Sequence, residues 1–360
     1  MVRLKLESGY LVVDLGSPRL IATTAHPKGL VTASKVAIVH VDKDADLSRP
    51  DDFKASVRGK LDLSEDDPVM LTAVDVNRYR EAVEGDYGVL ATVGLANAAC
   101  HNMEATYRPL TASTINIVAW VPDRLTVSAI LDLFRVVAET KAAAVADLML
   151  RCDGGRATGT VSDAIAVAAV PSNNGYLWAG QATTVGSKVA ALTYRALTAE
   201  SPSVDDELRW GLGVSLEELL DDAIKLYQAA PVPGLNSLEA REIIRRELEE
   251  ILRDPNVWPF IIAARESDLR GRSGLIPGLS RDEFEADSKR IIADELLATA
   301  LSVYINGFRA LTATYWADTL KGRLGLKLSA LPMFEDDIAA ALVASALSRV
   351  YDRLLGVGSV

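Results

Sequence analysis

The sequence predicts two domains: an α+β domain over residues 1–200, with a mixed sheet and flanking helices, and an all-α bundle over residues 207–360. A chain of 360 residues is long for one hydrophobic core. Strand patterns dominate up to about residue 200, and helical periodicity takes over after it. Residues 201–206 are short, polar and interrupted by a proline, which is typical of a linker.

Strand patterns fill most of the first 120 residues. Turns at residues 16–18 and 27–29, each with a proline and a glycine, separate the first three segments. A short amphipathic helix at about residues 51–61 interrupts the strands. The predicted strands, rich in Val, Ile, Leu and Thr, cover 9–14, 19–25, 30–41, 69–74, 87–93 and 114–121.

The rest of the first domain alternates helix and strand. A helical apolar period begins near Thr126 and ends at about Leu148. A strand over residues 157–170 and a closing helix over residues 188–199 follow. Helices therefore flank the sheet, as in an α+β or α/β domain.

The second domain is predicted to be helical throughout. Ser215 and Glu218 form a capping-box pattern at the start of one helix. One later segment carries no charge between Glu295 and Arg309, and at helical spacing Asp294 aligns with apolar residues as far as Phe308. We expect this segment to be the central apolar helix of the bundle. The other predicted helices cover residues 237–253, 283–309 and 335–355.

The charge and the cysteine content indicate which classes of function and which cellular compartment to expect. The net charge of −11 argues against general nucleic-acid binding, since a phosphate backbone would be repelled. Cys100 and Cys152 are too few for a disulfide framework, which favours a reduced, cytoplasmic setting. The first residues are charged and do not resemble a signal peptide. The longest uncharged helical run, residues 296–308, is too short to cross a bilayer, so we expect a soluble protein.

Two pairs of acidic residues stand at the heads of apolar helices in the second domain. Asp294 and Glu295 precede one, and Asp336 and Asp337 precede the other. Acids at a helix N-terminus are also common caps, so either pair alone has an ordinary structural explanation. Together, carboxylates from facing helices predict an oxygen-rich Mg²⁺ site.

Basic residues lie between the two acidic pairs. A mostly basic segment follows the central helix at its transition to a loop. It contains Lys321, Arg323 and Lys327, together with the acidic Asp318. Mg²⁺ with Lys or Arg suits phosphoryl transfer, because the charge to be stabilised sits on phosphate oxygens. Arg309 is either a bidentate phosphate clamp or an ordinary helix C-terminal charge.

The first domain offers polar residues at the ends of buried strands. These groups are either ordinary turn chemistry or the lining of a site. Glu139 and Lys141 interrupt an apolar helix and cannot face each other, so each needs another partner. Cys100 beside His101 is read as a buried cysteine rather than a nucleophile. The polar candidates at strand ends are Asn97, Thr114, Asn116, Thr158, Thr160 and Asp163.

Several motifs over about residues 8–200 resemble, in order, the adenosylcobinamide amidohydrolase family. They lie at residues 71–76, 91–98, 114–117, 139–144 and 157–163. The resemblance implies hydrolysis of the amide that joins a corrinoid to its aminopropanol arm. It implies Asp163 as a base, Thr158 and Thr160 as donors to the oxyanion, and Asn116 and Lys141 as residues that position the amide. Asn97, Thr114 and Glu139 complete the candidate site.

The second domain resembles the phosphatidylglycerophosphatase A-like proteins, especially their α-ribazole phosphatase branch. The matching residues include Asp294-Glu295, Gly307 with Arg309, Asp318 with Lys321, and Asp336-Asp337. The resemblance implies Mg²⁺ on the four paired acids, Arg309 and Lys321 on the phosphate, and Asp318 as a further ligand or base.

The two halves in one chain resemble bifunctional enzymes of corrinoid salvage. Such an enzyme would act on adenosylcobalamin or adenosylcobinamide, with corrinoid as a substrate rather than a cofactor, and on α-ribazole phosphate. A homo-oligomer is possible. The alternative is a lipid phosphatase fused to a non-catalytic corrinoid-binding domain, although the glycine-rich opening of the bacterial lipid phosphatases is not evident. A helical half that serves only as an interaction module is a further alternative.

Overall fold

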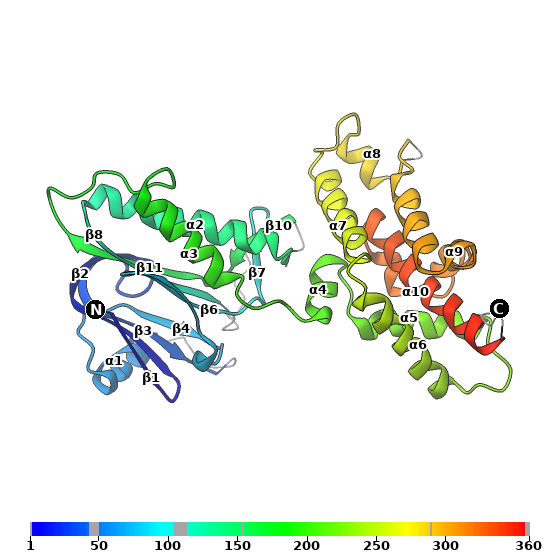
Figure 1. Cartoon of the computed structure of the whole chain (residues 1–360), viewed down its shortest axis with the longest axis horizontal. Coiled ribbons are helices and arrows are strands. Elements are labelled where there is room, and N and C mark those ends of the chain that lie inside the picture. The colour runs from blue at the N-terminus through cyan, green and yellow to red at the C-terminus, as the bar shows by residue number, and fades with distance from the viewer. Residues whose placement is uncertain (1, 43–49, 104–113, 153–154, 289, 357–360) are drawn as a thin grey trace. The chain divides into compact units, whose positions relative to one another are not determined.

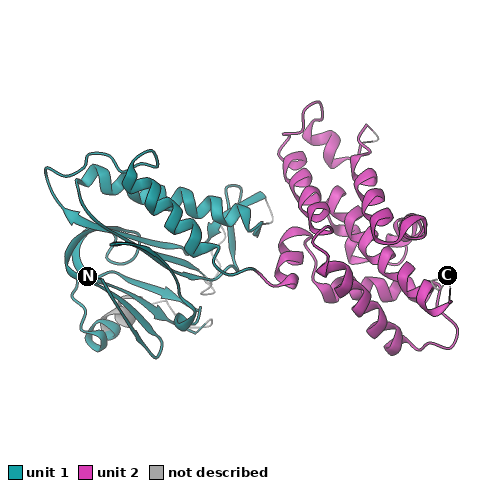
Figure 2. Cartoon of the chain, viewed as in Figure 1, with its two compact units in different colours: residues 1–201 teal, residues 202–360 magenta. Residues whose placement is uncertain are grey.

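The computed structural model describes residues 2–42, 50–103, 114–152, 155–288 and 290–356. The chain divides into two compact units, Met1–Ser201 and Pro202–Val360 (Figures 1 and 2). The division falls inside the predicted linker. The linker is shorter than expected, because Ser203 caps a helix that already begins at Val204.

Unit 1 combines a mixed sheet with flanking helices, as the sequence predicts, and it is an α/β domain. Its helices are α1 (Pro50–Leu61), α2 (Val127–Asp147) and α3 (Thr184–Leu197), with a short 3₁₀ helix, η1 (Val76–Arg78). Its strands are β1 (Arg3–Glu7), β2 (Tyr10–Thr23), β3 (Gly29–His40), β4 (Val69–Thr72), β5 (Arg80–Glu84), β6 (Tyr87–Val93), β7 (Ala98–Cys100), β8 (Ile115–Leu125), β9 (Arg151–Cys152), β10 (Gly155–Thr160) and β11 (Ala164–Pro171).

The main sheet runs in the order β4-β3-β2-β11-β8-β6-β5, and β1 pairs with β2 at the side of this path. β11 is parallel to β8 and β3 is parallel to β4, while the other neighbours are antiparallel. Helices α2 and α3 pack on each other and cover one face of the sheet (Figure 1). On α1, Val57 and Leu61 pack against Val12 and Val39 of the sheet. The register of β8 and β11 places Asn116 beside Ala164, where the two strands begin.

Two strand predictions in unit 1 are wrong in detail. β2 continues through residues 16–18, where a turn was expected, because a bulge between Asp14 and Arg19 absorbs the extra residues. The predicted strand over residues 157–170 is two strands, β10 and β11. A turn that contains Asp163 separates them and sends the chain into a different sheet.

A second, three-stranded sheet runs in the order β7-β10-β9. Cys100 of β7 and Cys152 of β9 form a disulfide across it, with Cα atoms 6.1 Å apart. The expectation of reduced cysteines is therefore wrong for this structure, and Cys100 has no free thiol that could act as a nucleophile. The two cysteines lie 52 residues apart in sequence and meet because β10 pairs with both of their strands.

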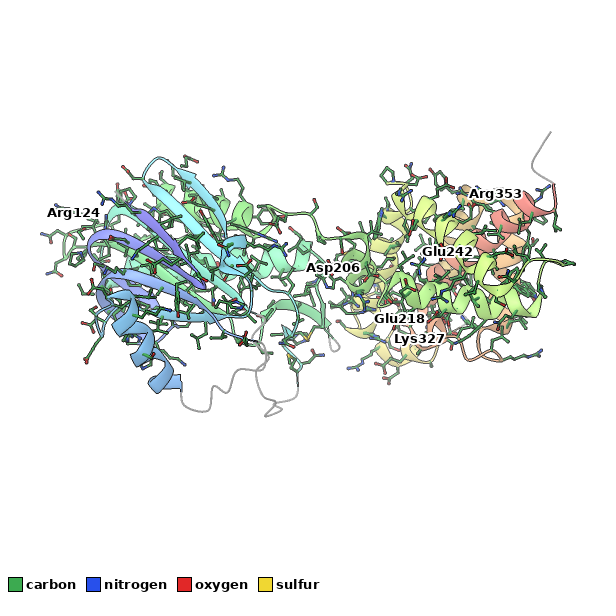
Figure 3. All side chains as sticks on the ribbon, turned by 90° about the horizontal axis from the view of Figure 1, so that it is seen from below. Arg124, Asp206, Glu218, Glu242, Lys327 and Arg353 are labelled. Atoms are coloured by element: carbon green, nitrogen blue, oxygen red, sulfur yellow. A yellow bond between two sulfur atoms is a disulfide. The ribbon has the colours of Figure 1, made fainter. Side chains whose placement is uncertain are left out.

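The regular elements of unit 2 are all helices among the residues that the structure describes. Ser215 and Glu218 form the predicted capping box at the start of α5. Glu218 also pairs with Lys327 at 2.6 Å (Figure 3). The helices are α4 (Val204–Gly211), α5 (Leu216–Ala229), α6 (Ser237–Arg253), α7 (Trp258–Arg272), α8 (Arg281–Glu285), α9 (Ala293–Lys321) and α10 (Met333–Leu354), with a 3₁₀ helix, η2 (Lys327–Ala330).

The most enclosed helix is α10 rather than the expected one. Residues 338–348 of α10 are all buried, and α10 packs on α5, α6, α7 and α9. α9 is interrupted at Asn306 and Gly307, and Gly307 has a φ of 61° that suits glycine. The interruption turns the rest of α9 away from the apolar face that begins at Asp294. Phe308 is consequently 76% exposed instead of buried.

α9 also differs from the sequence expectation in length. It continues past Arg309 to Lys321, and by length and composition alone it is long and apolar enough to cross a membrane. Only 28% of its most apolar window is buried. Leu296, Val303 and Tyr315 are among its exposed apolar side chains.

Candidate functional sites

An ion pair between Lys141 and Asp163 lies at the centre of the polar residues predicted in unit 1. Lys141 projects from the second half of α2, and Asp163 lies in the turn that joins β10 to β11. The two side chains are only 14% and 8% exposed. The polar partner that Lys141 requires is therefore Asp163, 22 residues further along the chain.

The carboxylate of Asp163 accepts three hydrogen bonds besides the one from Lys141. The backbone N–H of Ile115 donates to it at 3.1 Å, the backbone N–H of Thr160 donates at 3.0 Å, and the Thr160 hydroxyl donates as well. Hydrogen bonds of this kind occupy the lone pairs of a carboxylate. This arrangement suits a residue that holds Lys141 and the start of β8 in place better than it suits a general base.

Gly159 makes room for this ion pair. A Cβ atom at residue 159 would lie 2.1 Å from Oδ2 of Asp163 and 2.5 Å from Nζ of Lys141. Any other side chain would therefore push the two charged groups apart. The glycine is required by close approach, which the sequence pattern could not indicate.

Thr114 and Asn116 flank Ile115 at the start of β8, and both are buried. The side-chain amide of Asn116 donates to the carbonyl of Leu71 at 3.0 Å. Among the described residues, the Thr114 hydroxyl, the Asn116 amide oxygen and the hydroxyl of Thr92, which pairs with Asn116 across the sheet, have no hydrogen-bond partner. Unpartnered buried polar atoms are rare and costly. They mark the place beside Asp163 where a further hydrogen-bonding group is most needed.

The other predicted residues of unit 1 lie around this centre rather than in it. Asn97 accepts a hydrogen bond from the backbone N–H of Val161 through its carbonyl at 3.1 Å, next to the turn that holds Asp163. The exposed Thr158 hydroxyl donates to the carbonyl of Ala99 at 3.4 Å. Glu139 is exposed and pairs with Arg135 at 2.8 Å, so it does not join the Lys141–Asp163 pair.

Unit 2 contains a cavity of about 500 Å³ between the ends of its helices. All four paired acids of the sequence prediction line it, together with Asp318 and Lys321. The lining residues are Arg272, Phe284, Glu285, Asp287, Asp294, Glu295, Asp318, Lys321, Leu331, Pro332, Met333, Asp336 and Asp337.

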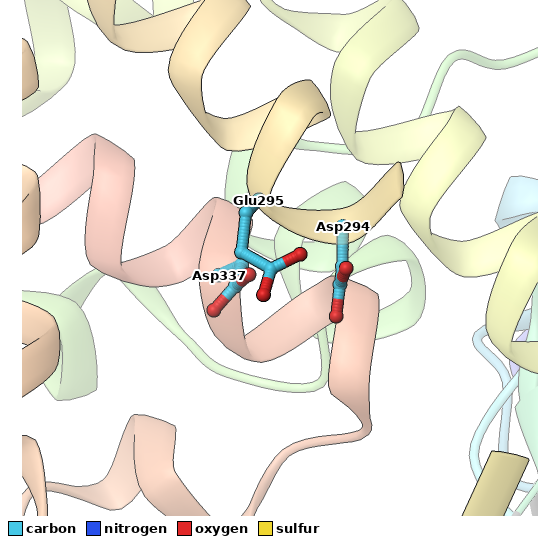
Figure 4. A group of neighbouring side chains, drawn as sticks. All are labelled: Asp294, Glu295 and Asp337. Carbon is cyan, nitrogen blue, oxygen red and sulfur yellow. The ribbon is translucent and has the colours of Figure 1, made fainter. Parts of the chain in front are cut away.

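The acids in this cavity form two overlapping groups. Asp294 and Glu295 at the start of α9 face Asp337 of α10, as Figure 4 shows. Asp318 and Asp336 form the second group with the same Asp337. In each group, one oxygen from every residue lies within 4.8 Å of the others, which is compatible with a shared cation. Asp337 belongs to both groups and is their link.

Lys321 supplies the positive charge nearest to the second acidic group. Its ammonium lies 2.6 Å from Asp318, 2.6 Å from Asp336 and 3.7 Å from Asp337. Burial by itself would lower the pKa of Lys321, but hydrogen bonds to Asp318 and Asp336 outweigh it and raise this pKa above its ordinary value. Lys321 is therefore a fixed cation that is already paired.

The carboxylates are not fully compensated by Lys321. Burial raises the pKa of Asp336 to about 6, although Lys321 opposes the shift. Burial, together with the charges of Asp336 and Asp318, raises the pKa of Asp337 to about 7. Burial, then Glu295 and Asp337, raise the pKa of Asp294, whose Oδ1 is buried with no hydrogen-bond partner in the described residues. The donor set is thus short of positive charge and fits a hard divalent cation.

Arg309 does not line this cavity. It pairs with Asp352 at 2.7 Å, and the side-chain amide of Asn306 donates to the same carboxylate at 3.0 Å. The structure therefore ties Arg309 to α10 beside the interruption of α9. Arg272, at the end of α7, is a cavity residue that sequence reasoning did not select. It resembles the ordinary basic residues that close many helices.

Solved structures match part of this chain only weakly. The protein ypjQ of Bacillus subtilis is 22% identical, with 43% of this chain and 94% of that protein covered at a TM-score of 0.35. The low temperature requirement C protein of Listeria monocytogenes is 23% identical, with coverages of 43% and 99% at a TM-score of 0.35. Similarity at this level carries no conclusion about this chain.

The sequence comparisons give a closer match. The adenosylcobinamide amidohydrolase of Halobacterium salinarum is 35% identical over 147 residues, which are 39% of this chain. The match spans 61% of the length of that protein. The family model for adenosylcobinamide amidohydrolase matches residues 2–202, more than half of the chain. Through these residues, the chain belongs to the adenosylcobinamide amidohydrolase family.

Proposed function

We propose that unit 1 is a corrinoid amidohydrolase of cobalamin salvage. It would hydrolyse the amide between the propionate arm of the corrinoid and the aminopropanol linker, in adenosylcobinamide or adenosylcobalamin, and release adenosylcobyric acid. The family match over residues 2–202 is the observation that carries this proposal.

The polar centre of unit 1 supplies groups that this reaction needs. Amide hydrolysis develops negative charge on the carbonyl oxygen, and a fixed cation or N–H donor lowers the barrier. We assign this role to the ammonium of Lys141, which Asp163 holds in place. Thr114 and Asn116, with their unpartnered oxygens, are proposed to hydrogen-bond the substrate amide or its attacking water.

Product analysis tests the amidohydrolase proposal directly. The purified full-length protein is incubated with adenosylcobinamide or adenosylcobalamin, and the corrinoid products are identified by mass. We expect adenosylcobyric acid from the wild type and about 100-fold less from Lys141→Met. Lys188→Met is the matched control, because Lys188 forms a more exposed pair with Glu84 in the same unit. Recovery of bound but uncut corrinoid would instead identify a carrier.

For unit 2 we propose a Mg²⁺-dependent phosphatase that acts on α-ribazole phosphate and releases α-ribazole. The two overlapping acidic groups joined at Asp337 carry this proposal. Asp294, Glu295, Asp336 and Asp337 would hold the metal. Bound Mg²⁺ would neutralise charge on the phosphate oxygens. Lys321 would keep Asp336 and Asp318 oriented, and Asp318 is proposed as a further ligand or as the base.

Metal dependence and a single substitution test the phosphatase proposal. We expect phosphate release from α-ribazole phosphate with Mg²⁺ and none with EDTA. Asp337→Asn should reduce the rate at least about 100-fold and abolish the rise in melting temperature on Mg²⁺ addition, because both acidic groups need Asp337. Asp282→Asn, in the first turn of α8 and outside the cavity lining, is the control. Equal rates with Mg²⁺ and EDTA would reject the proposal.

A lipid phosphate is the second candidate substrate. The exposed apolar side chains of α9 favour it, since they resemble a surface that contacts lipid. Phosphatidylglycerophosphate in vesicles and α-ribazole phosphate in solution should be compared as substrates. A specificity constant at least about 10-fold higher for α-ribazole phosphate is expected, and the reverse order would favour the lipid.

A further inference from the structure

The acidic cavity of unit 2 has few positive groups that a phosphate could meet. Among the described residues, its charged lining is dominated by Asp and Glu, and the cations that line it are Lys321 and Arg272. A phosphate monoester is a dianion near neutral pH, so carboxylates without a counter-charge would repel it. A phosphatase in this cavity therefore needs a cation that faces the substrate, in addition to the metal.

Lys321 is not free to serve this purpose. An ammonium has three N–H donors. The ammonium of Lys321 already makes short contacts to Asp318 at 2.6 Å and to both oxygens of Asp336 at 2.6 and 2.8 Å. Turning toward a phosphate would leave Asp318 and the largely buried carboxylate of Asp336 without their partner, and the loss is costly at Asp336, whose side chain is only 16% exposed. Lys321 is better described as part of the cavity wall.

Arg272 is placed differently. It is exposed at the end of α7, and no ion pair engages it among the residues that the structure describes. Its neighbour Arg270, by contrast, pairs with Glu266 at 2.9 Å. The guanidinium carries five N–H donors in a planar fork that matches two oxygens of a phosphate.

The backbone holds Arg272 at the cavity by close packing of α7 on α8. A Cβ atom on Gly271 would lie 2.2 Å from the ring of Phe284, so only glycine permits this approach. Phe284 is itself a cavity residue and stacks on Phe334 at a centroid distance of 6.5 Å. The residue next to Gly271 is thereby fixed beside the cavity, although its long side chain remains free to reach inward.

We propose that Arg272 binds the phosphate group of the phosphate-monoester substrate, in the place that the sequence assigned to Arg309. This inference rests on the proposed phosphatase function. The guanidinium would donate to the non-bridging phosphate oxygens, while the acidic groups hold the metal. Arg272 is thus a substrate-binding residue, separate from the metal ligands.

Three variants test this inference in the full-length protein: Arg272→Ala, Arg272→Lys and the neighbouring control Arg270→Ala. Hydrolysis of α-ribazole phosphate and inhibition by inorganic phosphate are measured with Mg²⁺. For Arg272→Ala we expect both the KM and the inhibition constant to rise about 10- to 100-fold, the range for loss of charged hydrogen bonds. Arg272→Lys should recover part of the loss. The Mg²⁺ concentration for half-maximal activity should change less than about 2-fold in all three variants.

The outcomes separate this inference from the proposed function. An active wild type with unchanged KM and phosphate inhibition in Arg272→Ala would overturn the role of Arg272 and leave the phosphatase intact. An inactive wild type would overturn the phosphatase. In that case, calorimetric titration of the Mg²⁺-loaded protein with inorganic phosphate still decides the role of Arg272. Binding that is lost in Arg272→Ala supports it, and no binding, or equal binding in both proteins, rejects it.

Discussion

At the scale of single residues, the ion pair of unit 1 depends on Gly159 having no side chain. We predict that Gly159→Ala lowers corrinoid amide cleavage at least about 10-fold, because the added methyl overlaps both Asp163 and Lys141. Steady-state rates with adenosylcobinamide measure the effect. Gly59→Ala on α1 is the control, since its Cβ would meet nothing within 4 Å. Full activity in Gly159→Ala would show that this ion pair is not needed for catalysis.

The carboxyl group of Asp268 in unit 2 holds the start of helix α10. It is fully buried and accepts hydrogen bonds from the backbone N–H groups of Phe334 and Glu335, at 3.1 and 2.9 Å, at the start of α10. Burial, and then the charge of Glu335, raise its pKa to about 7. An unfolded Asp has a pKa near 3.9, so the folded state binds the proton more tightly. The associated stability is full below about pH 4 and is lost as the pH rises through about 7.

We therefore predict that the metal-free protein becomes less stable as the pH rises from about 4 to about 7. Asp268→Asn should make this dependence shallower by up to about 1.4 kcal/mol per pH unit, the contribution of one proton. Denaturant unfolding in EDTA at several pH values measures the slope. An unchanged slope in the variant would mean that Asp268 is ionised throughout this range.

At the scale of elements, local patterns located the regular parts of the fold. The apolar period gave α2 to within one residue, and α6 and β6 have the predicted bounds. The predicted helix over residues 283–309 is instead α8, a loop and the first part of α9, because a long apolar period does not reveal where a chain turns.

Long-range packing determines the positions of site residues that local sequence patterns do not reveal. Asp294 and Asp337 were found together because each heads an apolar helix face, which is a local signal. Arg272 gave no such signal, since its place depends on Gly271 meeting the ring of Phe284. Arg309 was misplaced for a similar reason: the break at Gly307 redirects the helix that carries it.

The disulfide of the small sheet gives a prediction at this scale. Cys100 and Cys152 join β7 and β9 on either side of β10, the strand that leads to Asp163. Closing a loop of 52 residues restricts the unfolded chain, and its loss costs about 2–4 kcal/mol of stability. The double variant Cys100→Ser/Cys152→Ser should lower the melting temperature of unit 1. A dithiol reductant should do the same to the wild type and leave the double variant unchanged.

At the scale of the whole molecule, the two units have separate hydrophobic cores. Among the described residues, the buried core of unit 2 comprises residues between Leu208 and Val350, and the sheet clusters of unit 1, around Leu11 and Val12, contain none of them. Units with separate cores fold and lose stability independently unless a large interface couples them. The two proposed activities should therefore be separable by single substitutions.

We predict that Asp294→Ala abolishes phosphate release from α-ribazole phosphate and leaves corrinoid amide cleavage within about 2-fold of the wild type. Asp294 is a buried carboxylate of the first acidic group, so its loss removes a proposed metal ligand, whereas the Lys141–Asp163 pair belongs to unit 1. Both reactions are measured on one preparation. Lys141→Met is measured in the same way and should lose amide cleavage while it keeps phosphate release.

Because removal of a buried group can unfold a domain, Mg²⁺-free melting curves must show that unit 2 of Asp294→Ala is folded. Loss of both activities in a folded variant would mean that the sites are coupled, and loss of neither would remove Asp294 from the metal site.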